Sequence, residues 1–142
     1  AVARVVDRAE VAGELLAGLA SAKGISDRPL AFIAGGETVV KLTGKGLGGR
    51  NQELALAAAK VLDGREGTAL FSVGSDGTDG PTDAAGGYVD STTAERLRQQ
   101  GISIDAVLAD NDSYHALEKV DGLIITGATG TNVNDLAVLL VR

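Results

Sequence analysis

Residues 74–86 hold three carboxylates within eight positions, contributed by Asp76, Asp79 and Asp83. The segment follows an apolar run, residues 68–73, that is typical of a buried strand. We therefore expect the carboxylates just beyond a strand's carboxyl end, where open α/β sheets bind ligands. Such groups can bind Mg²⁺ together with substrate phosphate oxygens, or accept a proton from an alcohol. The alternative is ordinary turn chemistry, because Asp-Gly and Gly-Pro are common in turns.

A glycine-rich segment, residues 44–53, opens a predicted helix and could hold an anion. Free amides and the positive end of the helix dipole favour an anion there, and Lys45 and Arg50 add positive charge. The candidate phosphate-binding residues of this segment, besides Arg50, are Lys45, Gly46, Gly48, Gly49 and Asn51. Glycines at 44, 46 and 49 also match Gly-x-Gly-x-x-Gly, but a dinucleotide site needs a buried parallel strand before that pattern. The alternative is a flexible turn with a helix cap.

Two more segments, residues 110–114 and 126–135, are rich in neutral hydrogen-bonding groups suited to polyol or phosphate oxygens. Their candidate binding residues are Asn111, Asp112, Thr129, Thr131, Asn132 and Asn134. Asp112 could instead cap the helix that follows, and 126–135 could be a long turn that satisfies its own polar groups. The single histidine, His115, lies in a predicted helix, and Ser75 lacks the Gly-x-Ser-x-Gly elbow. The pattern therefore disfavours a hydrolytic triad.

The composition is that of one globular domain and excludes several classes of protein. The chain has 142 residues, 44% of them apolar and 23% charged. A net charge of −6 disfavours nucleic-acid binding. The longest apolar run, residues 136–141, is too short to span a membrane. The absence of cysteine excludes disulfides and thiolate ligands and fits a cytoplasmic location. Because methionine is absent, including an initiator, we expect a piece of a longer protein.

Periodicity and turn signals predict an α/β fold, with a mixed β-sheet of about five or six strands flanked by helices. Capping-box patterns at Asp7 and Thr92 predict helix starts. Gly35-Gly36 predicts the turn of an N-terminal hairpin. The expected strands are 30–34, 37–43, 68–73, 86–90, 123–126 and 136–141, those at 123–126 and 136–141 being buried. The expected helices are 7–23, 51–62, 92–100, 102–109 and 113–120.

Read together, five motifs in this order resemble the MOFRL domain, the C-terminal domain of the glycerate 2-kinase family, whose members are also labelled hydroxypyruvate reductase. The motifs are Gly-Gly-Glu-Thr at 35–38, Gly-Lys-Gly-Leu-Gly-Gly-Arg-Asn-Gln-Glu at 44–53, Ser-Asp-Gly-Thr-Asp-Gly-Pro-Thr-Asp-Ala-Ala-Gly at 75–86, Asp-Asn-Asp-Ser-Tyr at 110–114 and Thr-Gly-Ala-Thr-Gly-Thr-Asn-Val-Asn-Asp at 126–135. The resemblance covers residues 30–142, and residues 1–29 form a less similar helical lead-in.

The resemblance implies ATP-dependent phosphorylation of D-glycerate to 2-phosphoglycerate, with Mg²⁺, in a cleft shared with a larger N-terminal domain outside these 142 residues. It implies that Arg50 is the functional arginine and that Arg50 and Lys45 contact phosphate or the glycerate carboxylate. Asp76 or Asp79 would organise Mg²⁺ or accept the hydroxyl proton, while Asn111, Thr131 and Asn132 would hold substrate oxygens.

Other functions stay open at this point. One is an NAD(P)H-dependent hydroxypyruvate reductase, and another is a non-catalytic docking module. The expected partners are the N-terminal domain and glycerate, with neither nucleic acid nor membrane, and a homodimer stays open. We expect the acidic loop to form one side of the cleft, facing Arg50 across the end of the sheet.

Overall fold

The computed structural model describes residues 2–5, 8–21 and 28–142. The described strands are β1 (Val2–Val5), β2 (Leu30–Gly36), β3 (Thr68–Gly74), β4 (Gly86–Asp90), β5 (Leu123–Ile124) and β6 (Asp135–Val141). The described helices are α1 (Ala9–Gly18), α2 (Arg50–Leu62), α3 (Thr93–Gln99), α4 (Ile104–Ala109) and α5 (Ser113–Glu118).

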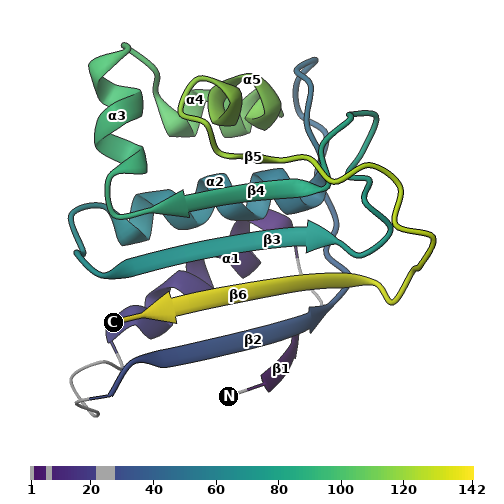
Figure 1. Ribbon diagram of the computed structural model, residues 1–142. Helices are drawn as coiled ribbons and strands as arrows, with labels where there is room; N and C mark the ends of the chain where they lie inside the picture. Colours follow the sequence, from purple (N-terminus) through teal and green to yellow (C-terminus); the bar gives the residue numbers. More distant parts are fainter. Residues whose placement is uncertain (1, 6–7, 22–27) are drawn as a thin grey trace.

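The strands form one mixed sheet in the order β1-β2-β6-β3-β4-β5. β1 runs parallel to β2, and all other neighbouring pairs are antiparallel. Because β6 lies between β2 and β3 and is antiparallel to both, these two strands point the same way and end at the same edge (Figure 1). The predicted mixed α/β fold is therefore confirmed.

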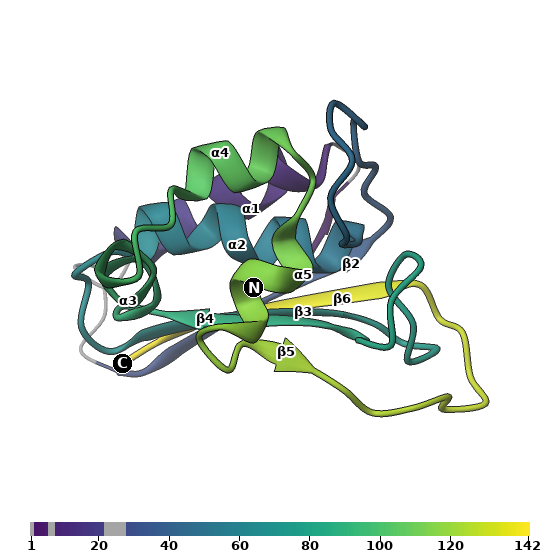
Figure 2. The same cartoon turned by 90° about the horizontal axis from the view of Figure 1, so that it is seen from above.

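Helices α1, α2 and α4 lie on one face of this sheet (Figure 2). α2 is the central element of the core, because residues 51–59 are all buried. Its small alanines let α1 pack closely against it, and a Cβ on Gly13 would lie 2.1 Å from the carbonyl oxygen of Leu54. The first turn of α2 is thereby fixed at the edge where β2 and β3 end.

The predicted N-terminal hairpin is wrong. Gly35 and Gly36 do not form a turn but continue β2, where they pair with Leu136 and Asp135 of β6. β6 pairs with the edge of β2 along which residues 37–43 would have had to pair in a hairpin. Those residues leave the sheet and keep a single bridge, between Val39 and Arg8.

Most other predicted elements are confirmed, with small shifts at their ends. The predicted buried strand 123–126 is shorter and more exposed: β5 has two residues, lies at the sheet edge, and leaves Ile125 58% exposed. The predicted cap at Thr92 does not form, since its hydroxyl donates to Asp90 instead. Asp7 lies outside the described residues, and α1 begins after Arg8. Among the described helices, none has the length and hydropathy needed to cross a membrane.

Candidate active site at one edge of the sheet

The motif segments predicted from the sequence meet at the edge where β2 and β3 end and β6 begins (Figure 1). Hydrogen bonds divide them into two groups. We call residues 43–53, 79–82 and 110–113 the inner cluster, in which Gly46 N donates to Asp110 O. We call residues 75–78 and 126–134 the outer loops, in which Ser75 N donates to Asn134 O. Arg50 belongs to the inner cluster but reaches towards β6, next to the outer loops.

Asp79 is the centre of the inner cluster. It is fully buried, and its two carboxylate oxygens accept four hydrogen bonds, from the backbone and side-chain nitrogens of Asn51 and Gln52. Burial raises the pKa of Asp79, while those donors favour its ionised form. The start of α2 therefore binds an anion of the same chain, the carboxylate of Asp79, and a ligand anion at this position stays a prediction.

The glycines of the inner cluster allow tight packing. A Cβ on Gly49 would lie 2.4 Å from the carboxyl carbon of Asp79, and one on Gly48 would lie 2.3 Å from the hydroxyl of Ser113. Cβ atoms on Gly44 and Gly46 would likewise come within 2.3 Å of the 110–112 segment. These contacts explain the glycine pattern without a ligand. The strand that a dinucleotide fingerprint requires before this segment is missing, since the structure shows residues 37–49 as an irregular segment.

Asn111 clamps the glycine-rich segment onto α2. Its side-chain oxygen accepts from the backbone nitrogens of Thr43 (2.7 Å) and Gly44 (2.9 Å). Its side-chain nitrogen donates to the Lys41 carbonyl (3.1 Å) and to Glu53 Oε1 (2.9 Å). Asn111 is buried, and its backbone has the left-handed conformation, with φ of 55°, which asparagine tolerates better than most residues. The side chain of Asn111 therefore makes its hydrogen bonds within the fold, and these contacts give no support to the substrate contact predicted for it.

Glu53 is a feature that sequence reasoning missed. It is 5% exposed, and burial raises its pKa to about 7, against the hydrogen bond from Asn111, which favours the ionised form. The negative charges of Glu10 and Asp79 raise this pKa further. Its signal in the sequence was weak, because a single glutamate in the first turn of a helix is an ordinary feature.

Arg50, the first residue of α2, forms a bidentate ion pair with Asp135, the first residue of β6. Arg50 Nε lies 2.5 Å from Asp135 Oδ2, and Nη2 lies 2.8 Å from Oδ1. The Asp135 side chain is only 9% exposed, whereas that of Arg50 is 33% exposed, and Nη1 takes no part in the pair. Hydrogen bonding to Asp135 raises the pKa of Arg50. The sequence patterns assigned no role to Asp135, which appeared only as the last residue of the motif at 126–135.

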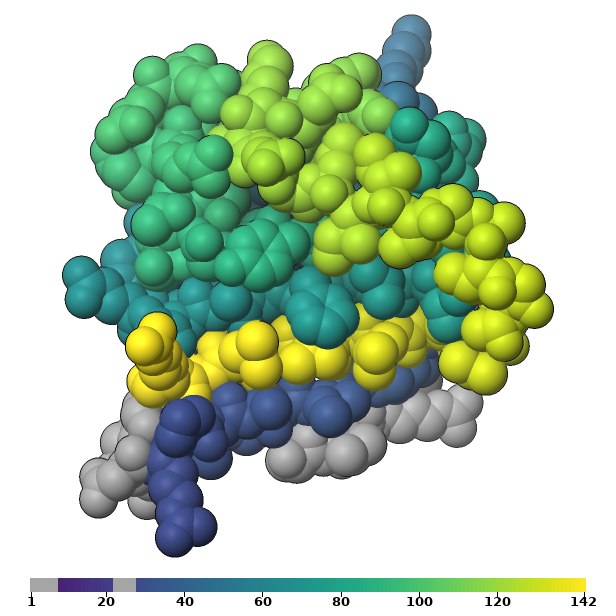
Figure 3. Space-filling model, in the orientation of Figure 1, coloured from purple at the N-terminus to yellow at the C-terminus, as the bar shows by residue number. Residues whose placement is uncertain are grey.

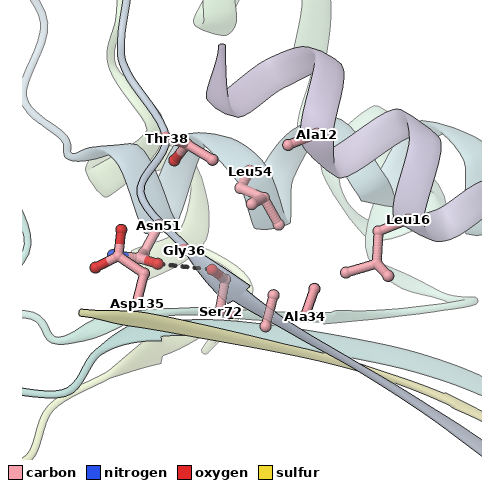
Figure 4. A pocket seen from close by; sticks show the side chains of 11 residues that line it. Ala12, Leu16, Ala34, Gly36, Thr38, Asn51, Leu54, Ser72 and Asp135 are labelled. Atoms are coloured by element: carbon pink, nitrogen blue, oxygen red, sulfur yellow. Dashed lines mark hydrogen bonds between the residues drawn. The ribbon is translucent and has the colours of Figure 1, made fainter. Parts of the chain in front are cut away.

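Two further contacts fix the position of the first turn of α2. Ser72 Oγ on β3 donates to Asn51 Oδ1 at 2.7 Å (Figure 4). Because Asn51 in turn donates to Asp79, a chain of hydrogen bonds runs from the sheet through Asn51 to Asp79. A cavity of about 20 Å³, lined in part by Thr38 and Asp135, lies beside it. That volume suits one water molecule, which would satisfy the buried Thr38 hydroxyl that has no partner among the described residues.

The outer loops keep most of their polar groups accessible. Ser75 accepts from the backbone nitrogen of Val133 at 2.7 Å, and the Thr129 hydroxyl donates to the Ser75 carbonyl at 2.5 Å. Asp76 Oδ1 accepts from the backbone nitrogen and the hydroxyl of Thr78. These bonds, with the nearby Arg50 charge, lower the pKa of Asp76. The remaining predicted residues here, Thr131, Asn132 and Asn134, are exposed.

The other predicted residues make local contacts with neighbouring segments. Lys45 is exposed, and its backbone nitrogen donates to Asp110. Asp83 accepts from the Tyr114 hydroxyl at 2.8 Å. Asp112 accepts from Leu47 N and contacts His115 Nδ1. Within residues 2–5, 8–21 and 28–142, no three acidic, histidine or cysteine side chains are grouped as a metal site.

Comparison with known proteins gives this architecture a family. The model of the MOFRL family matches residues 30–135. The chain is 55% identical over 137 residues to D-glycerate 2-kinase of Thermotoga maritima, which covers 94% of this chain and 33% of that protein. It is 50% identical over 114 residues to glycerate 2-kinase of Pyrococcus horikoshii, which covers 80% of this chain and 26% of that protein.

A crystal structure of glycerate kinase from Thermotoga maritima matches with a TM-score of 0.93 at 52% identity, covering 99% of this chain and 35% of that one. The chain thus spans about a third or less of the length of these relatives. The matched family model covers most of the chain and all four segments that meet at the sheet edge. The chain belongs to the MOFRL family.

Proposed function

We propose that these residues are the C-terminal domain of a glycerate 2-kinase, which transfers a phosphoryl group from ATP to the 2-hydroxyl of D-glycerate. The names of the relatives at 55% and 50% identity support this proposal. The observation that carries it is the ion pair of Arg50 with Asp135 at the edge where the motifs meet. It holds a partly exposed guanidinium in one orientation beside loops of accessible hydrogen-bonding groups.

Phosphoryl transfer depends mainly on positioning and on neutralising charge, so a fixed guanidinium is well suited to it. Arg50 contacts a phosphate or the glycerate carboxylate through its exposed side. The bond to Asp135 restricts the rotamers of Arg50 before substrate arrives, which reduces the entropy lost on binding. Thr131 and Asn132 of the outer loops supply neutral donors and acceptors for substrate oxygens, and Lys45 adds positive charge at the rim.

Of the two carboxylates considered for Mg²⁺, Asp76 fits and Asp79 does not. Asp79 is buried and already bound by four N–H groups. Asp76 lies in an outer loop, and its lowered pKa keeps it ionised. Mg²⁺ in nucleotide sites takes one or two carboxylates plus phosphate oxygens and water, so Asp76 would hold an ion that neutralises phosphate charge. A lowered pKa also makes Asp76 a weak base, which disfavours proton abstraction as its role.

The test is Arg50→Ala in the full-length protein, with a product assay that separates 2-phosphoglycerate from 3-phosphoglycerate and from NADH oxidation. We expect kcat/KM for glycerate to fall by about a hundredfold to a thousandfold, as when one transition-state donor is removed. Arg50→Lys should recover part of that loss, because it keeps the charge without the bidentate geometry. Arg96→Ala, at an exposed position on α3, is the matched control. Unchanged kcat/KM in Arg50→Ala would show that the arginine has been assigned wrongly.

The same assay separates the alternatives. NADH-dependent reduction of hydroxypyruvate without glycerate phosphorylation would replace the kinase proposal with a reductase. The proposed cleft is shared with an N-terminal domain, and the 142 residues supply only the side at the end of the sheet. We therefore expect no turnover from these residues in isolation. Turnover by them alone would contradict the shared cleft.

A further inference from the structure

The face of the sheet turned away from the helices is apolar over its three central strands, β2, β6 and β3, and β4 adds Tyr88 and Asp90 at one side. We call it the open face, and Figure 3 shows it. Residues 33, 138, 71 and 88 are paired in one row across β2, β6, β3 and β4. The two neighbouring rows on this face are also uncharged over β2, β6 and β3, and they consist of residues 31, 140 and 69 and of residues 35, 136 and 73. By strand register, the open face consists of Ala31, Ile33, Gly35, Ala69, Phe71, Val73, Tyr88, Leu136, Val138 and Leu140.

Large apolar side chains on this face are accessible. Ile33 is 40% exposed, Tyr88 41%, Leu136 39% and Leu140 45%. A sheet with one wet face normally alternates apolar inward with polar outward residues. β3 departs from that rule, because Ser72 points inward and is buried while Phe71 and Val73 point outward. The sequence is thus that of a sheet covered on both faces.

The size of the patch indicates what covers it. At about 4.8 Å between strands and about 3.4 Å per residue, three rows of same-face residues over the three central strands span roughly 300 Å². Two copies meeting through this face would bury on the order of 600 Å², below the roughly 1,200 Å² of a stable association between separate chains. A segment of the same polypeptide needs less area, because its local concentration is high. The chain spans 33% of the Thermotoga maritima relative, so that relative has ample chain to supply a cover.

We propose that the open face is the docking surface for an apolar segment from the part of the polypeptide outside residues 1–142. The loop between β5 and β6 projects on the same side (Figure 2) and carries the exposed Ile125 (58%) and Val133 (76%). The docked segment therefore also borders an outer loop of the candidate site. This inference rests on the proposed function only in taking the protein to be longer than these residues.

The test is cysteine accessibility in the full-length protein. These 142 residues contain no cysteine, so each single replacement introduces the one thiol within them, and labelling is measured on the peptide that carries it. Leu140→Cys and Ile33→Cys report on the open face, and Ala106→Cys, at an exposed position on α4, is the matched control. We expect maleimide to label the two open-face cysteines at least about tenfold more slowly than the control, since labelling requires local opening of a packed contact. The protection should persist over a wide dilution series.

Labelling of Leu140→Cys and Ile33→Cys as fast as Ala106→Cys would overturn the proposal. Protection that disappears on dilution, together with a dimeric mass by light scattering, would also overturn it and identify a second copy as the cover. Glycerate phosphorylation is measured separately on the same variants. Protected cysteines without kinase activity would reject the proposed function and leave the docking surface standing.

Discussion

The inner cluster and the outer loops are built from the same residue types and differ in where their polar groups are satisfied. In the inner cluster, Asp79 and Asn111 are buried and make all their hydrogen bonds within the protein. In the outer loops, Asp76 is partly accessible and Thr131 is exposed. A buried carboxylate with four donors holds a fold together, whereas an accessible one can still bind a ligand. The composition of a motif thus does not tell residues that support the fold from residues that can bind a ligand. Their burial does.

The strongest test of this distinction is Asp79→Ala. It removes the cap of α2 and leaves three buried donors without their acceptor: the backbone nitrogens of Asn51 and Gln52 and the side-chain nitrogen of Asn51. Each unpartnered buried donor costs about 1–3 kcal/mol, so we expect the free energy of unfolding to fall by at least about 3 kcal/mol. Urea unfolding of the protein measures this loss.

The matched control is Asp83→Ala in the same acidic loop. Asp83 is exposed and accepts one bond from Tyr114, so its removal should cost no more than about 0.5 kcal/mol. Equal losses for the two variants would mean that Asp79 does not support the fold in the way its contacts indicate.

A smaller effect is expected from Glu53→Gln. The folded pKa of about 7 lies above the ordinary value of 4.5, so between these pH values the folded state holds a proton that the unfolded chain releases. The contribution of Glu53 to stability is therefore fully present below pH 4.5 and is lost as pH rises through 7. Glutamine keeps an acceptor for Asn111 and does not ionise. We expect it to raise the free energy of unfolding by on the order of 2 kcal/mol at about pH 8, and to change it little at about pH 4.

Unfolding measured at both pH values checks this prediction. Glu118→Gln, at an exposed position on α5, is the matched control. A stability difference between Glu53→Gln and the parent that is the same at both pH values would show that burial does not control this ionisation.

The sequence predicted where the motifs meet better than how they are organised there. The strand before Asp76 and the helix after Arg50 follow from local patterns, so the meeting of the motifs at one edge was predictable. The insertion of β6 between β2 and β3 was not, because long-range pairing turned the local hairpin signal at Gly35-Gly36 into continuous strand. Nor could spacing separate Asp76 from Asp79. These residues are three positions apart in one loop, and only the packing of α2 decides which of them is buried.

The finest test of the same distinction is Asp135→Asn, because Asp135 belongs to the fold but acts on the site. It keeps one acceptor oxygen for Arg50 and loses the charge and one of the two bonds. The guanidinium then samples more orientations, and we expect kcat/KM for glycerate in the full-length protein to fall by about tenfold, equivalent to about 1.4 kcal/mol. Steady-state kinetics of purified protein measures the fall.

Asp105→Asn provides the matched control, since Asp105 is also an ion-pair acceptor, for Lys60, but its side chain is 80% exposed and lies away from the site. It should leave kcat/KM unchanged, as expected for a solvated pair. The double variant Arg50→Ala with Asp135→Asn gives the sharper answer. If Asp135 acts only by orienting Arg50, removing it after the arginine is gone should cost nothing more. A further tenfold loss in the double variant would mean that Asp135 contacts the substrate itself. Asp135 would then belong to the site rather than to the residues that only support the fold.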